Sequence, residues 1–388
     1  MKQYDSYKDS GVEWIGEVPS HWEVVPLKRA ITINNGCDYK HVQVEEDGYP
    51  VIGSGGQFAW ANQYMYDGEA VLLGRKGTID KPMYYNGKFW TVDTMFYGIP
   101  KKNANCKYLY YQAKNIPFER YATATALPSM TQTDLNNNTI CLPPLDEQIV
   151  IANYLDKKCS EIDNVISAQQ KRIALLQELK QSVITHAVTK GLNPNVEMKD
   201  SGVEWIGEVP KHWEIKKLKY ITFLQSGDTI KPSDFKDEGE YPVYGGNGFR
   251  GYTDKYTNEG LHVLIGRQGA LCGNINYANG RFYASEHAIV SYPLHGENVV
   301  WLGETMRTCD FNRYSQTAAQ PGIAVNVIKN IAFPYPSIKE QNDIANYLNK
   351  RCASIDNVLS KAQHQVELLQ EYKQSLITEV VTGKRKVS

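Results

Sequence analysis

The sequence predicts an α+β protein in which two mixed, mostly β domains are separated by two long antiparallel coiled-coil helices in a pseudo-two-fold internal repeat. Three observations support this fold class. Residues 147–189 and 340–382 align without a gap and are identical at 26 of 43 positions. Residues 9–23 recur at 200–214 with 14 of 15 positions identical. The intervening stretches are rich in Tyr, Val, Ile, Gly and Asn, in short runs broken by turn signals, which is typical of β domains.

The order segment, domain, helix therefore occurs twice along the 388 residues, a length that suits two or three domains. This order predicts seven regions. They are residues 1–23, the N-terminal repeat segment; 24–144, the first variable domain; 145–189, the first long helix; 190–214, a linker and the second repeat segment; 215–337, the second variable domain; 338–382, the second long helix; and 383–388, a basic tail.

The repeated segment, DSGVEWIGEVPxHWE, begins the protein and returns after the first helix and a turn-rich linker. Two near-identical elements in one chain usually pair about a pseudo-two-fold axis, which makes the helices antiparallel. Each segment should then lie near a helix end, and the two chain termini should be neighbours. Trp14, Trp22, Trp205 and Trp213 are predicted to anchor these junctions; the alternative is that they are exposed contacts for a partner protein.

The two variable domains share three landmarks and differ freely between them, which indicates one scaffold with two different surfaces. Turn signals such as YNGK and ANGR break the predicted strands, and helices are expected over residues 107–114 and 298–308. The landmarks are YPVIGSGG at Tyr49 with YPVYGGNG at Tyr241, VLLGRKG at Val71 with VLIGRQG at Val263, and KFWTVDT at Lys88 with RFYASEH at Arg281.

Each helical run has apolar residues at steps of three and four and contains no Pro or Gly. Such a narrow stripe is typical of a coiled-coil seam. A run would form a rod of roughly 60 Å, and the other copy is the expected partner. The register stays open because Gln169 aligns with Ala362. The predicted pairing residues are Leu155, Ile162, Ile166 and Leu176 with Leu348, Ile355, Leu359 and Leu369, and the same stripe includes Cys159, Leu179, Cys352 and Tyr372.

Composition excludes several classes of protein. Hydrophobic content is 42% without an apolar run that approaches eighteen residues, and no signal peptide is recognisable, so we expect a soluble, cytoplasmic protein without a membrane partner. Seven cysteines without a CxxC pair argue against a disulfide framework and a zinc site, so no metal is expected. The net charge of −1 counts mildly against nucleic-acid binding but does not exclude it.

Catalytic signatures are also missing from the sequence. We find no GxxxxGK[ST] phosphate loop, no GxGxxG between a strand and a helix, no HExxH, no GxSxG, and no Asp, Asn or Ser before Pro-Pro-aromatic. No catalytic residues are therefore predicted. A long chain without a catalytic constellation, but with two different domains on one support, is expected to position something else.

The tandem order of a variable domain, a helix beginning EQxxIAxYL, and the segment DSGVEWIGEVPxHWE resembles the specificity subunit of Type I restriction-modification systems. The resemblance covers essentially the whole chain, including the GR[KQ]G loops and the PxxxEQ helix starts. It implies that residues 24–144 and 215–337 are target-recognition domains, each specific for one half of an asymmetric bipartite site in double-stranded DNA. It further implies a non-catalytic subunit whose helices set the spacer and dock two DNA adenine methyltransferase subunits, with restriction/translocase subunits completing the complex. S-adenosylmethionine, ATP and magnesium are expected only on those partners, and no cofactor on this chain.

Candidate DNA-binding residues lie at glycine-rich loops, where the backbone can approach DNA closely. Within GRKG and GRQG, Arg75 and Arg267 either bind DNA or pair with an internal carboxylate. Because the arginines are common to both domains they suit phosphate contact, whereas Lys76 against Gln268 is the more promising difference in specificity. Further differing positions are Ser54 and Gln57 against Gly246 and Arg250, and Thr94 against His287; Trp60, Tyr64 and Tyr252 are candidates for stacking on an extruded base.

Two rival functions remain open from sequence. One is a stand-alone bipartite DNA-binding protein, or a specificity subunit for a fused methyltransferase-nuclease. The other is a coiled-coil scaffold whose domains bind proteins, which predicts no salt-dependent DNA binding, whereas a DNA-binding protein loses affinity steeply as salt rises.

Overall fold

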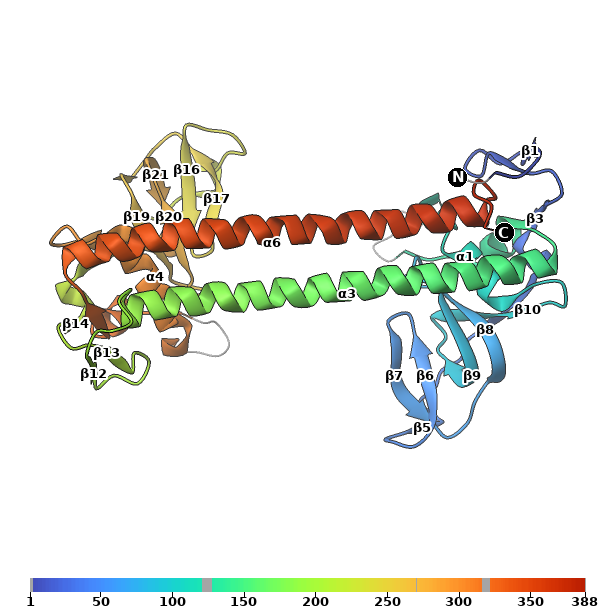
Figure 1. Ribbon diagram of the computed structural model, residues 1–388, viewed down its shortest axis with the longest axis horizontal. Coiled ribbons are helices and arrows are strands. Elements are labelled where there is room, and N and C mark those ends of the chain that lie inside the picture. The colour runs from blue at the N-terminus through green and yellow to red at the C-terminus, as the bar shows by residue number, and fades with distance from the viewer. Residues whose placement is uncertain (1–2, 121–127, 270, 316–321, 388) are drawn as a thin grey trace. The chain divides into compact units, whose positions relative to one another are not determined.

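The computed structural model describes residues 3–120, 128–269, 271–315 and 322–387 (Figure 1). It divides into two compact units: unit 1 comprises Met1–Gln170 and His364–Ser388, and unit 2 comprises Lys171–Gln363. Two long helices, α3 (Leu145–Lys190) and α6 (Ile338–Val381), contribute residues to both units. Each unit thus holds one mostly β domain and part of each long helix, which confirms the predicted α+β class with its internal repeat.

The domain of unit 1 is built on a seven-stranded sheet in the order β4-β10-β8-β9-β6-β7-β5. Neighbouring strands are antiparallel except β6 and β9, which run parallel with Val51 opposite Trp90. Strand β9 joins two halves of the sheet because it pairs with β8 along most of its length and with β6 at its end. The strands are β4 (Ile31–Asn35), β5 (Gln43–Val44), β6 (Tyr49–Gly53), β7 (Gly56–Ala61), β8 (Tyr66–Gly74), β9 (Met83–Thr91) and β10 (Met95–Pro100).

Unit 2 divides most of these pairings between two four-stranded sheets, β15-β22-β19-β20 and β17-β16-β21-β18. The counterpart of the β5–β7 pair is an isolated bridge between Lys236 and Tyr252. Strands β20 and β21 together take the place of β9. The strands are β15 (Thr222–Ser226), β16 (Tyr241–Gly245), β17 (Gly248–Thr253), β18 (Asn258–Glu259), β19 (His262–Gly266), β20 (Ile275–Ala278), β21 (Arg281–Ala284) and β22 (Ala288–Pro293).

The predicted turns at YNGK and ANGR have different outcomes. In unit 2, Asn279 and Gly280 separate β20 from β21, and Gly280 has a φ of +83°. In unit 1 the prediction is wrong, because Gly87 lies inside β9, opposite Gly68 of β8. These two glycines have φ values of +125° and +140°, which other residues rarely adopt, so the ladder continues through a site that resembles a turn in sequence.

The repeated segments form matching hairpins at the edge of each domain. In unit 1, β1 (Tyr7–Asp9) pairs with β2 (Glu17–Pro19), and β3 (Glu23–Pro26) pairs with β11 (Thr139–Leu142). In unit 2, β12 (Met198–Asp200) pairs with β13 (Glu208–Pro210), and β14 (Glu214–Lys217) pairs with β23 (Ala332–Tyr335). Trp22 and Trp213 are fully buried and act as the predicted anchors, whereas Trp14 and Trp205 are half-buried against the same two cores.

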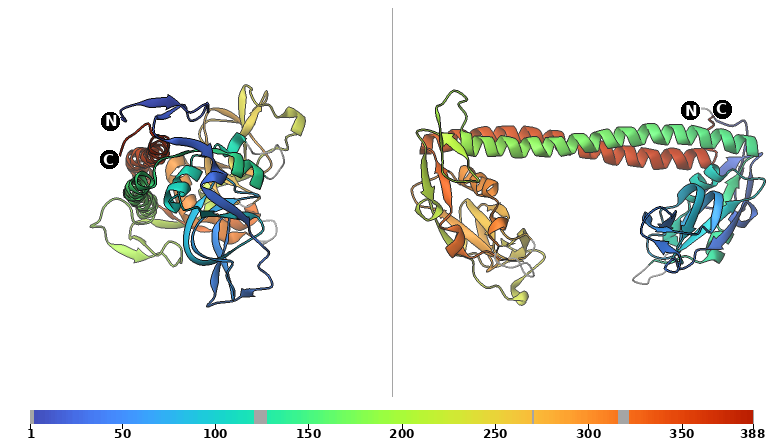
Figure 2. Two further views of the ribbon diagram at one scale, coloured as in Figure 1. Left: turned by 90° about the vertical axis from the view of Figure 1, so that its right-hand side faces the viewer. Right: turned by 90° about the horizontal axis from the view of Figure 1, so that it is seen from below.

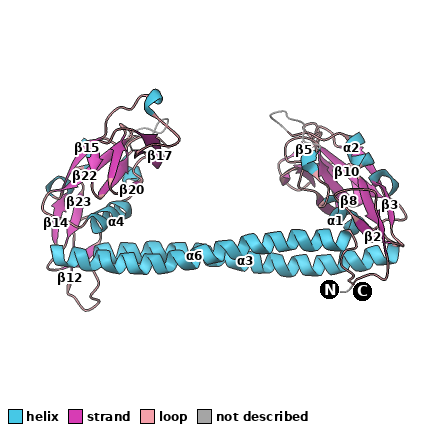
Figure 3. Cartoon of the chain, turned by 90° about the horizontal axis from the view of Figure 1, so that it is seen from above, coloured by secondary structure: helices cyan, strands magenta, loops and turns pink. Residues whose placement is uncertain are grey.

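A short helix lies between each sheet and the long helices, as α1 shows in Figure 3. Helix α1 (Cys106–Ala113) contacts β8, β9 and β10, and its Tyr111 hydroxyl donates to Asp156 of α3 at 2.8 Å. Helix α4 (Val299–Cys309) contacts β19 and β20 in the same way. Both begin at an Asn cap, Asn105 or Asn298, whose side chain accepts a backbone hydrogen bond. The remaining α-helices of the described residues are the short α2 (Gln132–Asn137) and α5 (Val325–Ile328).

The glutamines of the repeated EQ pair connect these short helices to the long ones. Gln148 is fully buried in the first turn of α3, and its side-chain oxygen accepts from the backbone N–H of Asn105 at 2.9 Å. Gln341 of α6 does the same for Asn298 at 3.0 Å. The side-chain nitrogens donate to Pro143 and Pro336 carbonyls. Each EQ pair therefore fixes where a long helix begins relative to its own domain.

The long helices pack against each other antiparallel within each unit. In unit 1 the start of α3 shares one apolar core with the end of α6, and Asp163 pairs with Lys373. In unit 2, Ile184 and Val188 pack with Leu348, and Lys180 pairs with Asp356. Of the predicted pairing residues, Leu176 and Leu369 are half-buried and the others are buried: Leu155, Ile162, Ile166, Leu348, Ile355 and Leu359.

Two residues assigned to the seam from sequence lie outside it. Leu179 and its repeat equivalent Tyr372 are exposed. Each stands four residues after another exposed apolar residue, Leu175 or Leu368, and residues four apart share one face of a helix. The apolar pattern thus comprises two adjacent stripes, of which only one is buried between α3 and α6.

The chain termini meet in unit 1, as predicted. The Tyr7 hydroxyl donates to the Gly383 carbonyl at 3.3 Å, and the Lys386 ammonium lies 5.5 Å from the ring centre of Tyr4. Figure 2 shows both ends beside the same end of α6. In unit 2 the corresponding place is occupied by the continuous chain between α3 and β12.

Candidate nucleic-acid interface

The two GRxG loops follow the ends of β8 and β19, and main-chain hydrogen bonds hold each between two other segments. In unit 1 the backbone N–H of Arg75 donates to Thr94 at 2.8 Å, and its carbonyl accepts from Met130 at 3.0 Å. In unit 2 Arg267 makes the same pair of bonds with His287 and Ile323, both 2.9 Å. Each loop therefore has a fixed backbone, and the differences between the domains lie in side chains.

The turn between β6 and β7, and its counterpart between β16 and β17, belongs to the same end of each sheet. A Cβ atom on Gly246 would lie 3.1 Å from the carbonyl oxygens of both Gln268 and His287. In unit 1 the equivalent turn residue is Ser54, which is half-buried. The sequence-predicted loop residues are thus brought together at one end of each domain.

The strand register corrects one sequence match at this turn. Both hairpins have a bulge at the same point, and Ile52 stands opposite Gln57 as Tyr244 stands opposite Phe249. Gln57 therefore corresponds to Phe249, and Arg250 corresponds to Phe58. Continuing the landmark YPVIGSGG with YPVYGGNG without a gap gives the same correspondence, so the earlier match of Gln57 with Arg250 was one residue off.

Neither loop arginine pairs with a carboxylate in the described part of the chain. The Arg75 guanidinium donates to the Asp93 main-chain carbonyl at 3.2 Å and lies 5.8 Å from the Phe96 ring centre. Arg267 donates to the Glu286 carbonyl at 3.5 Å. Both side chains are half-buried and keep further N–H groups for a ligand, since a guanidinium has five donors.

The differing residues of the two loops are accessible. Lys76, Gln57, Gln268 and Arg250 are exposed, and Thr94 and His287 are half-buried. The Arg250 guanidinium lies 5.2 Å from the Phe235 ring centre.

Not every predicted aromatic residue lies at this end. Tyr64 packs on Tyr49 with ring centres 5.0 Å apart, and the Lys88 ammonium lies 4.9 Å from the Tyr64 ring. Tyr49 begins β6, whereas the Gly-rich turn follows the end of that strand, so Tyr64 belongs to the opposite end. Trp60 is exposed on β7, and Tyr252 packs against Phe249 with ring centres 5.1 Å apart.

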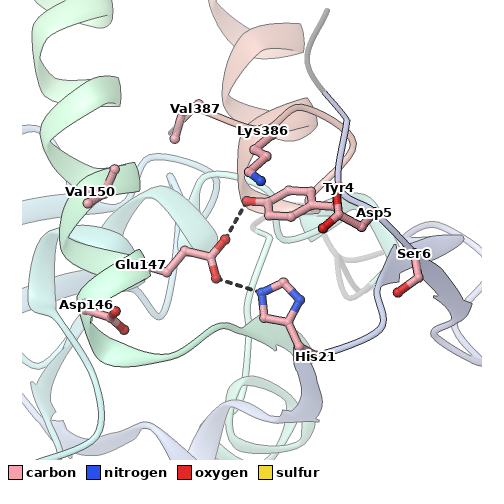
Figure 4. Close-up of a pocket in the computed structure, with 9 residues that line it drawn as sticks. All are labelled: Tyr4, Asp5, Ser6, His21, Asp146, Glu147, Val150, Lys386 and Val387. Atoms are coloured by element: carbon pink, nitrogen blue, oxygen red, sulfur yellow. Dashed lines mark hydrogen bonds and ion pairs between the residues drawn. The ribbon is translucent and has the colours of Figure 1, made fainter.

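Sequence reasoning missed the role of the glutamates in the EQ pairs. Glu147 accepts hydrogen bonds from the Tyr4 hydroxyl at 2.6 Å and from His21 at 2.9 Å (Figure 4). It also accepts from the Trp22 indole at 3.2 Å. Burial, and then the hydrogen bond to Glu147, raise the pKa of Tyr4 well above its usual value, so its hydroxyl stays protonated. Tyr4, His21 and Glu147 line a pocket of about 440 Å³ together with Lys386.

Glu340 has the same role in unit 2 with a different third partner. It accepts from His212 at 2.8 Å, from the Trp213 indole at 3.1 Å and from the Ser337 hydroxyl at 2.9 Å. The signal that could have revealed this contact was present in the sequence, because HW and EQ are identical in both repeats. Each EQ pair joins a repeat segment, a domain and a long helix.

An apolar groove lies on the helix pair of unit 1. It has a volume of about 380 Å³, and its exposed members include Val165, Leu368 and Tyr372, the last being 50% exposed. The repeat equivalents in unit 2 are Val358, Leu175 and Leu179; Leu175 is 64% exposed. Each unit therefore presents an equivalent apolar surface, which we call the helix patch.

No group of His, Cys, Asp and Glu that could hold a metal ion occurs among the residues whose structure is described. Within the same residues, no helix is both long and apolar enough to cross a membrane.

The fold and the loops together define a class of protein. In this class the chain is internally duplicated, and the same scaffold carries two different loop surfaces. The model of the Type I restriction modification DNA specificity domain matches the chain twice, over residues 19–175 and 210–367. The chain therefore belongs to the family of type I restriction-modification specificity subunits, and its two domains are target-recognition domains.

Individual relatives agree with this assignment. The chain is 40% identical over 139 residues, 35% of each chain, to the type I restriction enzyme EcoprrI specificity subunit of Escherichia coli. It is 26% identical over 351 residues to the MjaVIII specificity subunit of Methanocaldococcus jannaschii, covering 82% of this chain and 76% of the relative. A chain from a solved structure on complex assembly and conformational transition of the type I R-M system has a TM-score of 0.72 at 15% identity, over 94% of this chain and 98% of that one; this similarity concerns the fold.

Proposed function

We propose that the protein directs a type I modification complex to an asymmetric, two-part sequence in double-stranded DNA. Each target-recognition domain recognises one half of the site through the end of the sheet that carries its GRxG loop. One observation carries this proposal: the two loops have the same backbone hydrogen bonds but different exposed side chains, Lys76 in one and Gln268 in the other. A common backbone suits phosphate contact, and different side chains suit different bases.

The helix patches support the docking of two copies of one partner. Exposed apolar side chains on a polar helix pair are typical of an interaction surface, and the two patches occupy repeat-equivalent positions. We assign them to two DNA adenine methyltransferase subunits. In this proposal restriction/translocase subunits join that complex, and S-adenosylmethionine, ATP and magnesium bind only to the partner subunits.

Genome-wide adenine methylation tests the function directly. Cells that co-express the chain with the methyltransferase of its own system are expected to acquire methylation at an asymmetric two-part motif with a fixed spacer. Exchange of residues 24–144 for the domain of a relative should change one half of the motif, and exchange of 215–337 the other half. Co-purification of both proteins without any new methylation would contradict the proposal.

The long helices are proposed to set the spacer. Insertion of one heptad into each helix, at equivalent positions, adds about 10 Å and keeps the apolar seam in phase. The expected motif keeps both half-sites and gains a few base pairs between them. An unchanged spacer would show that the helices do not determine this distance.

A further inference from the structure

Three side chains form a chain of polar contacts in the second target-recognition domain that ends at its GRQG loop: an ion-pair contact joins Glu286 to His287, and a hydrogen bond joins His287 to Gln268. The Glu286 carboxylate accepts from the backbone N–H of Ile230 at 3.3 Å through one oxygen. Its other oxygen lies 3.3 Å from Nε2 of His287. Nδ1 of His287 lies 3.1 Å from Oε1 of Gln268. Each side chain is thus held by the one before it, and the exposed Gln268 is the last.

The backbone keeps this chain of side chains in place. The carbonyl of His287 accepts from Arg267, the residue before Gln268, and the carbonyl of Glu286 accepts from the Arg267 guanidinium. Gly246 lies directly against the Gln268 and His287 carbonyls, where even a Cβ atom would be tight. His287 therefore has little freedom to leave Gln268, although both are near the surface.

The chemistry of the three groups makes the direction of the Gln268 amide depend on His287. A carboxylate only accepts, so Nε2 of His287 carries the proton that faces Glu286. If Nδ1 also carries a proton, as in the imidazolium, it donates to the amide oxygen and the NH₂ group of Gln268 faces away. In a neutral ring whose proton is on Nε2, Nδ1 accepts, so the amide is turned and its oxygen faces away. The arrangement in this structure places Oε1 toward the imidazole and leaves the NH₂ group outward.

A glutamine that presents one defined end distinguishes base edges, because an NH₂ group pairs with acceptors and an amide oxygen pairs with amino groups. An unrestrained glutamine offers both. Resting on the function proposed above, we propose that Gln268 contacts a base of the second half-site and that His287, held by Glu286, is the positioning residue that makes this contact selective. Its ligand is the major-groove edge of one base pair.

The first domain lacks this arrangement at the equivalent positions. Asp93, Thr94 and Lys76 replace Glu286, His287 and Gln268, and Thr94 interacts with the loop through its carbonyl, which accepts from Arg75 and Lys76. A lysine ammonium is a point charge with three equivalent donors and has no preferred end. The first half-site therefore serves as an internal control in the same molecule.

The test is the methylation motif of cells that co-express the methyltransferase with His287→Thr, which introduces the residue of the first domain. We expect one position of the second half-site to accept additional bases, with discrimination reduced about tenfold, while the first half and the spacer are unchanged. Gln268→Ala, at an exposed position, should relax the same position. Glu286→Gln retains an acceptor for Nε2 and should preserve the motif, whereas Glu286→Ala should relax it.

Other outcomes would overturn the inference. An unchanged motif in both His287→Thr and Gln268→Ala would show that these residues carry no specificity. Loss of all methylation in a His287→Thr protein that melts like the wild type would show that His287 contributes to DNA affinity and not to the choice of base. Thr94→Ala in the first domain is the matched control, and it should leave the second half-site unchanged. Absence of any two-part motif with the wild-type chain would instead contradict the proposed function itself.

Discussion

Lys373 of α6 contacts both carboxylate oxygens of Asp163 in α3 at 2.6 Å. The repeat-equivalent pair, Lys180 and Asp356, does the same in unit 2 at 2.7 and 2.8 Å. Each helix thus supplies one Lys and one Asp to these two pairs, and the duplicated sequence pairs with itself antiparallel in one register. This pairing settles the register that the apolar stripe alone left open.

The Lys373–Asp163 pair is predicted to contribute modestly to stability. Lys373→Asp should destabilise the protein, and the reciprocal change Asp163→Lys should restore most of the loss, with a coupling of about 0.5–1 kcal/mol because both groups are partly solvent-exposed. Chemical unfolding of the single and double variants measures the coupling. The same exchange at Lys180 and Asp356 is the matched control, and independent, additive effects would argue against the pairing.

Glu147 is predicted to hold the chain ends in place. Glu147→Ala leaves the buried Tyr4 hydroxyl and Trp22 indole without their acceptor, at a cost of about 1–3 kcal/mol. Tyr4→Phe removes one bond only and should cost less. Limited proteolysis of the first residues of the chain measures the effect, and Glu340→Ala, which lacks a counterpart of Tyr4, should leave those residues protected. Equal exposure of the N-terminal residues in both variants would contradict this role.

Glu340 is predicted to make unit 2 sensitive to acid. Burial opposes ionisation of its carboxyl group, but hydrogen bonds from His212, Trp213 and Ser337 outweigh burial and hold the pKa of Glu340 below its usual value. A carboxyl group whose folded-state pKa is lowered stabilises the fold above its unfolded pKa of about 4.3. That contribution is lost as the pH falls through the folded-state pKa.

Unfolding followed from pH 6 downward tests this prediction for Glu340. The wild type should lose stability more steeply than Glu340→Gln below pH of about 4.3, because the variant has no proton to bind at this site. Parallel curves for the two proteins would show that Glu340 does not contribute. A substitution at the exposed Glu178 serves as a control for net charge.

The helix patches are predicted to determine how many methyltransferase subunits bind. Leu368→Ser with Tyr372→Ser should leave the unfolding midpoint nearly unchanged, since both side chains are exposed, and should reduce the bound methyltransferase from two copies to one. Leu175→Ser with Leu179→Ser should act alike, and the combined variant should bind none. Mass measurement of the purified complexes counts the subunits. Two bound copies of the methyltransferase in the combined variant would show that it docks on a surface other than the helix patches.

Arg75 is predicted to contribute to the salt dependence of DNA binding. If its guanidinium neutralises one phosphate, Arg75→Gln should lower the slope of log affinity against log salt by about 0.9. Gln268→Ala carries no change in charge and should leave the slope unaltered. Titrations at several salt concentrations with the methyltransferase complex decide between the two. An unchanged slope for Arg75→Gln would contradict a phosphate contact of Arg75.

The sequence by itself determined the duplicated architecture, because 3.6-residue periodicity, the absence of Pro and Gly, and the near identity of residues 9–23 and 200–214 are local signals. It also located the GRxG loops and the neighbourhood of the chain termini. Only the tertiary structure decided which stripe of each helix is buried, and that Gly87 continues a strand while Gly280 breaks one. It also revealed the contacts of Glu147 and the link from Glu286 to Gln268. These features depend on contacts between separate segments of the chain or on strand register, and such contacts leave no periodic trace in the sequence.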